Sequence, residues 1–169
     1  MKADAIGSPT TFEELAERAE NAGVKLEITA GVPTWEAFPG PRHQKAVLRA
    51  LLSIERSALN CGCFQLPDVY IKFPDGSLRR PDLAVFCDEP PDTDEALESI
   101  PEAVLEVLIK DYEKKDTEIG APFYLKQGVK DVILFDPRTQ VATHRRRDGT
   151  TVYKSPATIA LECGCRITI

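Results

Sequence analysis

Glu106 is the residue whose surroundings most favour a chemical role. It lies inside the nearly continuous apolar run Ala103–Ile109, which is typical of a strand covered on both faces. Alternation along a strand sets Glu106 on the same face as Val104 and Leu108. A lone buried carboxylate is costly unless a cation, a metal ion or hydrogen-bond donors compensate its charge. We therefore expect such a group beside Glu106.

Asp82 has a similar context earlier in the chain. It heads an apolar segment, and Pro81 before it indicates a strand start or a sheet edge, where a side chain can reach a cleft. If Asp82 and Glu106 lie on adjacent strands, they form a natural site for a hard divalent cation such as Mg²⁺, which uses one or two carboxylates. The alternative is structural: Asp82 caps a turn with Arg79 or Arg80, and Glu106 forms a core ion pair.

The five cysteines include two Cys-Gly-Cys pairs, Cys61/Cys63 and Cys163/Cys165. An odd count in a chain whose first residues lack the apolar core of an export signal predicts reduced thiols rather than a disulfide framework. Four thiolates could hold zinc if the pairs met in space, but zinc ligands usually have two to four residues between cysteines, and here there is one. We expect small buried thiols on strands, with a zinc site as the alternative.

Length and composition limit the class of protein. The 169 residues fit one domain, and 43% hydrophobic with 28% charged residues is ordinary globular usage. A net charge of −6 argues against wide coating of nucleic acid or anionic membrane, while local contact with phosphates remains open. No stretch approaches the ~20 apolar residues of a membrane span. We expect a cytoplasmic protein without a membrane segment.

Hydrophobic periodicity predicts the elements that position these residues. Thr11 and Glu14 form a capping box that starts a helix at about 12–21, and apolar spacing predicts the longest helix at about 42–60. A further helical stretch is expected after Ile109. Strands are predicted at 24–29, 33–38, 63–66, 68–73, 78–87, 103–109, 131–135, 141–145 and 150–154, followed by a last strand or two. This order predicts a single domain over residues 1–169 with an α/β (α+β) fold, in which helices flank a mixed central β-sheet.

Several segments, in their order and spacing, resemble the Uma-two family of restriction endonuclease-like proteins, which belongs to the PD-(D/E)XK nuclease superfamily. The resemblance covers about residues 12 to 137. The segments that carry it are Leu26–Gly31, Pro41–Gln44, Pro81-Asp82, Val104–Leu108, Tyr124 and Gly128–Pro137. It implies a restriction endonuclease-like core with the site of a metal-dependent phosphodiesterase.

The resemblance also implies roles for residues. Asp82 and Glu106 would bind Mg²⁺ or Mn²⁺, which activates water and neutralises charge on the phosphoryl oxygens. A lysine would complete the site by stabilising the anionic transition state. The superfamily usually has that lysine two residues after the glutamate, where this chain has Leu108, and many family members have it on the following helix, where this chain has Gly120.

Nearby lysines are candidates for the missing cation. Lys110 shares the strand face of the glutamate but lies four residues on, roughly 13 Å along a strand. Lys115 falls in helical register with Ile119 and Phe123, so on a continuous helix it faces the sheet, whereas Lys114 faces solvent. A proline in this stretch weakens the assumption of continuity. We select Lys115, with Lys110 in support, and a solvated helix face is the alternative for each.

Glu27 and His43 are supporting candidates. Alternation points Glu27 away from Leu26 and Ile28, which predicts an exposed residue, although in the resembled family a glutamate at this place lies near the cleft. His43 is expected on the core-facing stripe of its helix, where it could orient a ligand or a phosphate. A satisfied core or capping group is the alternative.

These inferences predict a small metal-dependent endonuclease that hydrolyses DNA. A homodimer is expected, because cutting a duplex needs a second active site for the other strand. The alternative is a catalytically degenerate protein of the same fold that acts as a binding or regulatory module. Leu108, Gly120 and the net charge of −6 favour this alternative.

Overall fold

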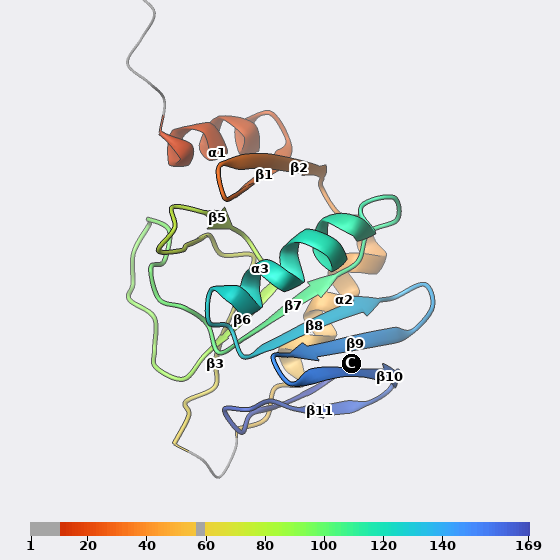
Figure 1. The fold of residues 1–169 in the computed structure, drawn as a ribbon. Coiled ribbons are helices and arrows are strands. Elements are labelled where there is room, and N and C mark those ends of the chain that lie inside the picture. The colour runs from red at the N-terminus through yellow and green to blue at the C-terminus, as the bar shows by residue number, and fades with distance from the viewer. Residues whose placement is uncertain (1–10, 57–59) are drawn as a thin grey trace, which may run out of the picture.

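The computed structural model describes residues 11–56 and 60–169 and has a central β-sheet with helices on both faces (Figure 1). The helices of these residues are α1 (Phe12–Asn21), α2 (Pro41–Leu52) and α3 (Ala121–Lys126), and a π-helix, η1 (Lys115–Gly120), leads directly into α3. Among them, none has both the length and the apolar character needed to cross a membrane. The predicted α/β (α+β) class with a mixed central sheet is confirmed.

Six strands form the central sheet in the order β10-β9-β8-β7-β6-β3. They are β3 (Phe64–Pro67), β6 (Leu83–Phe86), β7 (Ala103–Val107), β8 (Asp131–Asp136), β9 (Val141–Arg146) and β10 (Gly149–Lys154). β7 and β8 are parallel, whereas the other neighbouring pairs are antiparallel. A parallel pair needs a crossover connection, and η1 with α3 supplies it.

Two smaller sheets complete the described strands. The first has the order β2-β1-β5-β4 and contains β1 (Val24–Thr29), β2 (Val32–Ala37), β4 (Ile71–Lys72) and β5 (Leu78–Arg79). The second is the hairpin of β11 (Thr158–Ala160) and β12 (Arg166–Thr168). Helix α1 packs on β1 and begins with the predicted capping box, in which the amide of Glu14 donates to Thr11 Oγ1 at 3.2 Å.

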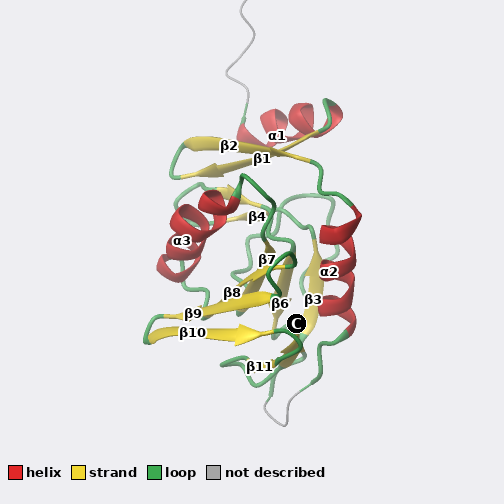
Figure 2. Ribbon diagram, turned by 90° about the vertical axis from the view of Figure 1, so that its right-hand side faces the viewer, coloured by secondary structure: helices red, strands yellow, loops and turns green. Residues whose placement is uncertain are grey.

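Helices α2 and α3 cover opposite faces of the six-stranded sheet (Figure 2). Alternation along the strands supplies an apolar layer to each helix. Between α2 and the sheet, Val47 and Ala50 of the helix pack in one cluster with Leu83, Val85 and Leu105 of the strands. Between α3 and the sheet, Phe123 and Tyr124 of the helix pack in one cluster with Ala84, Phe86 and Val104 of the strands. His43 is buried on α2 together with Val47 and Ala50, as the sequence predicted.

Helix α2 is shorter than predicted, because it ends at Leu52 rather than near residue 60. The Ser53 hydroxyl donates to the carbonyl of Ala50 at 2.7 Å and accepts from the amide of Thr168 at 2.8 Å. Glu55 then forms a β-bridge with Arg166. The backbone after Leu52 therefore pairs with the C-terminal strand instead of continuing the helix. Residues 57–59 of the predicted helix lie outside the described residues.

The cysteines differ from the prediction of reduced thiols on strands. Disulfides join Cys61 to Cys87 and Cys63 to Cys165, and Cys163 is a free thiol. All five lie in loops beside β3, β6 and the β11–β12 hairpin. The two Cys-Gly-Cys pairs do meet in space.

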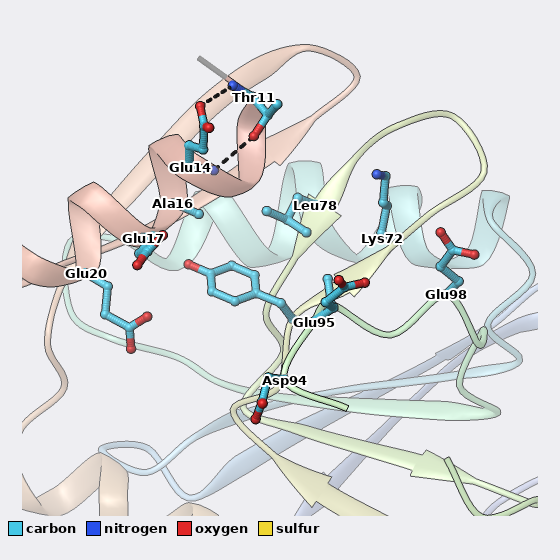
Figure 3. Close-up of a pocket in the computed structure, with 12 residues that line it drawn as sticks. Thr11, Glu14, Ala16, Glu17, Glu20, Lys72, Leu78, Asp94, Glu95 and Glu98 are labelled. Atoms are coloured by element: carbon cyan, nitrogen blue, oxygen red, sulfur yellow. Dashed lines mark hydrogen bonds between the residues drawn. The ribbon is translucent and has the colours of Figure 1, made fainter. Parts of the chain in front are cut away.

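A cavity of about 710 Å³ beside α1 is strongly acidic (Figure 3). The carboxylates in its lining are Glu14, Glu17, Glu20, Asp94, Glu95 and Glu98. Such a concentration of negative charge repels the phosphates of nucleic acid. Neither Asp82 nor Glu106 lines this cavity, so it is separate from the predicted site.

Candidate active site

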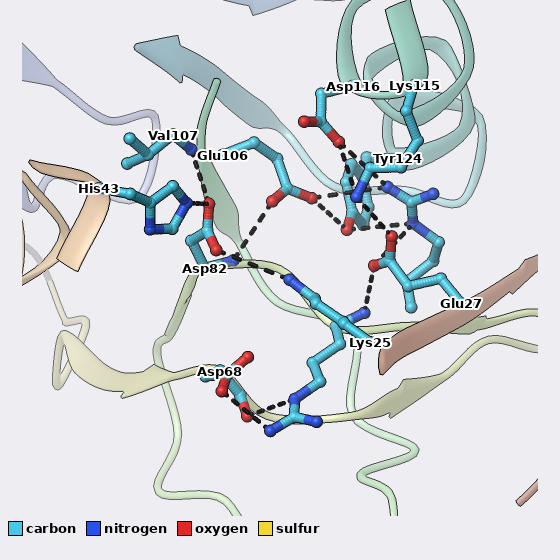
Figure 4. Close-up of polar contacts among 12 residues, drawn as sticks. Lys25, Glu27, His43, Asp68, Asp82, Glu106, Val107, Lys115, Asp116 and Tyr124 are labelled. Carbon is cyan, nitrogen blue, oxygen red and sulfur yellow. Dashed lines mark hydrogen bonds and ion pairs between the residues drawn. The ribbon is translucent and has the colours of Figure 1, made fainter. Parts of the chain in front are cut away.

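Asp82 and Glu106 meet because of the register between β6 and β7. The strands pair antiparallel with Leu83 opposite Leu105, and the same register continued by one residue sets Asp82 opposite Glu106. The amide of Asp82 donates to Glu106 Oε2 at 3.3 Å, and the amide of Val107 donates to Asp82 Oδ2 at 2.7 Å (Figure 4). The two acids selected from the sequence therefore lie side by side.

Asp82 is also held by two basic side chains. Nε2 of His43 lies 3.0 Å from Asp82 Oδ2, and Nζ of Lys25 lies 3.6 Å from Asp82 Oδ1. Burial alone would raise the pKa of Asp82, but Lys25 and His43 hold the pKa below its usual value. Asp82 is thus an oriented carboxylate whose partners are a lysine and a histidine rather than Arg79 or Arg80.

Glu106 is held by Tyr124 and Arg79. The Tyr124 hydroxyl donates to Glu106 Oε1 at 2.8 Å, and Nη2 of Arg79 lies 3.5 Å from the same oxygen. Burial raises the pKa of Glu106 well above its usual value, and the neighbouring carboxylates Asp116 and Asp82 raise the pKa further. The core ion pair that was the structural alternative for Glu106 is therefore present, with Arg79 as its cation.

Glu27 and Lys115 form the other side of the cluster. Nζ of Lys115 donates to Glu27 Oε2 at 2.9 Å and lies 3.3 Å from Asp116 Oδ1. Nε of Arg79 lies 3.4 Å from Glu27 Oε1, to which the amide of Arg80 donates at 2.7 Å. Burial alone would raise the pKa of Glu27, but Arg79 and Lys115 lower it below its usual value.

The prediction that Glu27 is exposed is wrong, because both faces of β1 are covered and only 1% of Glu27 is accessible. Ile28 packs against Ala16 of α1 on one face. The other face carries Glu27 and, two residues earlier, Lys25, which sequence reasoning missed. The available signal was alternation, which sets Lys25 and Glu27 on the same face of the strand.

Lys115 reaches the cluster and Lys110 does not. Lys110 is exposed beyond the end of β7, and Lys114 is exposed as predicted. The predicted stripe is wrong at Ile119, which is 44% exposed. In a π-helix the hydrogen bonds join residues five apart instead of four, so Gly120 rather than Ile119 lies above Lys115.

We call this group of side chains the acid–base cluster. Its members are Lys25, Glu27, His43, Arg79, Asp82, Glu106, Lys115, Asp116 and Tyr124. Four carboxyl groups face three cations in it. Burial alone would lower the pKa of Lys25, but Asp82, Glu27 and Glu106 raise it, so this lysine stays an ammonium. Burial, Asp116 and Asp82 raise the pKa of Glu106, so removal of its proton is less favourable than for a carboxyl group in water.

The two central carboxylates fit a hard cation. One oxygen of each is fixed by a short hydrogen bond, from the Val107 amide for Asp82 and from the Tyr124 hydroxyl for Glu106. The other oxygens are Asp82 Oδ1, which lies 3.6 Å from Nζ of Lys25, and Glu106 Oε2, which lies 3.3 Å from the Asp82 amide. Two oriented carboxylates side by side are the ligand type that suits Mg²⁺ or Mn²⁺.

The sheet and its helices define a restriction endonuclease-like fold. The family model described as "Putative restriction endonuclease" (Uma2) matches residues 9–162, and the chain belongs to this family. A solved structure of a "putative nuclease" from Anabaena variabilis is 18% identical, with a TM-score of 0.57 over 80% of each chain, which shows the fold. The comparison with curated proteins finds no match. The resemblance to the Uma-two family drawn from the sequence is confirmed.

Proposed function

We propose that this protein is a metal-dependent endonuclease of the PD-(D/E)XK type that hydrolyses DNA phosphodiester bonds, with Asp82 and Glu106 as the ligands of Mg²⁺ or Mn²⁺. The observation that carries the proposal is the pairing of these two carboxylates across β6 and β7, with the ammonium of Lys115 in the same cluster. The family and the fold support a nuclease.

The proposed roles follow from the contacts. A bound divalent ion supplies Lewis acidity toward the phosphoryl group. The ammonium of Lys115, held by Glu27, stabilises negative charge that develops on the phosphate. His43 and Tyr124 are positioning residues, since each holds one carboxylate oxygen in place and neither needs to touch the substrate.

A homodimer and a cytoplasmic location remain predictions. A dimer would bring two acid–base clusters to the two strands of a DNA duplex. The measurement is the mass of the protein in solution, with and without DNA, by light scattering.

A binding or regulatory module is the second candidate, and one observation favours it. The carboxylates of the cluster are already compensated within the protein, Asp82 by Lys25 and Glu27 by Arg79 and Lys115. The side chains of Asp82 and Lys115 are at most 10% exposed, so a substrate phosphate has limited access to the cluster.

A titration with Mn²⁺ separates the two candidates. The EDTA-treated protein is titrated with Mn²⁺ while its melting temperature is recorded, and nicking of supercoiled plasmid is followed at the same Mn²⁺ concentrations. Mn²⁺ is used because it prefers carboxylates to thiolates, so the cysteines contribute little. Glu106→Gln tests the proposed ligand. Asp68→Asn, which removes an exposed carboxylate that pairs with Arg80, is the matched control.

An endonuclease shows a rise in melting temperature and plasmid nicking, with both lost in Glu106→Gln and both kept in Asp68→Asn. Stabilisation by Mn²⁺ without nicking favours the binding module. The absence of any Mn²⁺ response, or nicking that persists in Glu106→Gln, would overturn the proposed site.

A further inference from the structure

Five cysteine sulfurs converge at the end of β6 opposite to Asp82. Cys61 and Cys63 precede β3, Cys87 follows β6, and Cys163 and Cys165 lie in the turn between β11 and β12. The sulfur atoms of Cys61, Cys87 and Cys163 all lie within 4.8 Å of one another, and so do those of Cys61, Cys63 and Cys165. We call these five residues the cysteine cluster, with Cys61 common to both groups.

The loops that carry the cysteines are shaped by glycine. A Cβ atom on Gly62 would collide with the ring of Phe64 and would lie 2.8 Å from the carbonyl oxygen of Cys87, so only glycine fits. The amide of Gly62 donates to the same carbonyl at 2.8 Å, which joins the loop before β3 to the end of β6. Gly164 has a positive φ of 93°, which allows the tight turn between Cys163 and Cys165.

Two disulfides do not explain this convergence. Each disulfide needs only its own two sulfurs, yet Cys61 Sγ lies 3.5 Å from Cys165 Sγ of the other disulfide. The free thiol of Cys163 lies 3.4 Å from Cys165 Sγ as well. In a tetrahedral zinc site, bonds of about 2.3 Å set thiolate sulfurs roughly 3.8 Å apart. The spacing between sulfurs of different pairs is therefore close to that of ligands around one ion.

We propose that the cysteine cluster, when its cysteines are reduced, binds one zinc ion through four thiolates. Cys61, Cys163 and Cys165 are three of the ligands because the sulfurs of Cys61 and Cys163 both lie next to Cys165. Cys63 or Cys87 supplies the fourth. Soft thiolates select zinc over Mg²⁺ or Mn²⁺, so the ligand class differs from that of the acid–base cluster.

Burial favours a structural ion. Cys165 is 0% exposed and Cys61 and Cys63 are buried in the core beneath α2, which closes the site on one side. Cys87 and Cys163 are partly exposed and leave a route for the ion to enter. With no open position for substrate, four thiolates give a structural rather than a catalytic site. The ion would tie the β11–β12 hairpin to β3 and β6.

Disulfide exchange is a less suitable use of the free thiol. Burial raises the pKa of Cys163, and the nearby carboxylates of Asp131 and Glu102 raise it further, so little of it is present as the nucleophilic thiolate at neutral pH. A zinc ion would compensate the charge of the bound thiolate. The geometry of the sulfurs, rather than this pKa, carries the proposal.

The test is a titration of the full chain with Co²⁺ under a phosphine reductant and without oxygen. Five reactive thiols are first counted with a thiol reagent in denaturant, which establishes that both disulfides are reduced. The expected result is one Co²⁺ per chain, with the intense visible bands of tetrahedral thiolate coordination and sulfur-to-cobalt charge transfer. Zn²⁺ should displace Co²⁺ and raise the melting temperature.

Single serine variants identify the ligands. Cys61→Ser, Cys163→Ser and Cys165→Ser should each weaken Co²⁺ binding by at least tenfold and change the charge-transfer band. One of Cys63→Ser and Cys87→Ser should retain the parent spectrum, and it serves as the matched control for loss of a cysteine that is not a ligand. The Co²⁺ spectrum of the parent protein decides the question even if a variant fails to fold.

A fully reduced parent chain that binds neither Co²⁺ nor Zn²⁺ would overturn the proposal and leave a disulfide-linked cluster. Parent-like binding in Cys61→Ser would overturn it as well, because Cys61 belongs to both groups of sulfurs.

Discussion

Gly120 makes room for the guanidinium of Arg79, since a Cβ atom on Gly120 would lie 2.8 Å from Arg79 Nη2. Arg79 is completely buried and contacts both Glu27 and Glu106. The family resemblance placed a lysine at position 120. In this chain the guanidinium of Arg79, on β5, lies against position 120 instead. Lys115, one π-helical turn before Gly120, supplies a second cation.

Gly120→Ala should destabilise the protein by about 1–3 kcal/mol, because the added methyl group collides with a buried guanidinium that is held by Tyr124 and by ion pairs. The measurement is the free energy of unfolding from denaturant titration. Gly149→Ala is the control, since a Cβ atom there meets no atom within 4 Å. Equal stability of the two variants would contradict the close packing of Arg79.

Asp82 and Glu106 should respond in opposite ways to neutralisation in metal-free protein. Asp82→Asn should lower the melting temperature, because Lys25 loses one of the carboxylates that compensate its buried charge. Glu106→Gln should leave the melting temperature unchanged or raise it, since the ionised form of Glu106 is disfavoured by burial, Asp116 and Asp82. The measurement is thermal unfolding in EDTA at neutral pH.

The pH dependence gives the sign of the Glu106 effect. An acid whose pKa is raised on folding contributes full stability below its unfolded pKa, about 4.3, and loses it as the pH rises toward the folded value. The advantage of Glu106→Gln over the parent should therefore grow above about pH 4. An advantage that shrinks with rising pH would show that the folded protein favours the ionised form.

The pairing of Asp82 and Glu106 was predictable because both lie in apolar segments of the sequence, where a buried charge is costly unless a partner compensates it. Local signals also gave α1, through the Thr11/Glu14 capping box, and β1, whose bounds match the prediction. These features depend on neighbours in the sequence, so periodicity and capping chemistry are sufficient to find them.

The features that were missed depend on distant parts of the chain. Glu27 is buried because β1 has α1 on one face and the acid–base cluster on the other. Helix α2 ends early because Thr168, more than one hundred residues later, bonds to Ser53. Gly120, at the end of the π-helix η1, lies against Arg79 from a distant strand, and four-residue periodicity could not reveal the π-helix.

Asp131 should make the largest acid-sensitive contribution outside the acid–base cluster. It is fully buried at the start of β8. Its carboxylate accepts hydrogen bonds from Nε of Arg146 at 2.6 Å and from the amide of Glu162 at 2.8 Å. Nε2 of His144 lies 2.7 Å from Asp131 Oδ1. Burial alone would raise the pKa of Asp131, but these groups lower it. Asp131→Asn should cost about 3 kcal/mol at pH 7.

A lowered pKa means that the stabilisation is present above the unfolded pKa, about 3.9, and is lost as the pH falls through the folded value. The difference in unfolding free energy between the parent and Asp131→Asn should therefore be largest at neutral pH and shrink in acid. Asp136→Asn, at the other end of β8, is the control, because its pair with Arg138 is partly exposed and should cost about 1 kcal/mol or less. A difference that is independent of pH would contradict the role of the Asp131 charge.

Lys115 and Lys114 provide the sharpest test of the proposed chemistry, because they are neighbours with the same charge and different surroundings. Lys115 donates to Glu27 within the acid–base cluster, whereas Lys114 is exposed. If the protein cleaves DNA, Lys115→Ala should lower the cleavage rate by about 10²–10³, the usual effect of losing one charge-stabilising donor. Lys114→Ala should change the rate little. Mn²⁺ affinity should persist in Lys115→Ala, because an ammonium does not ligate a metal ion. The measurements are single-turnover plasmid cleavage and Mn²⁺-dependent melting, and equal rates for the two variants would remove Lys115 from the site.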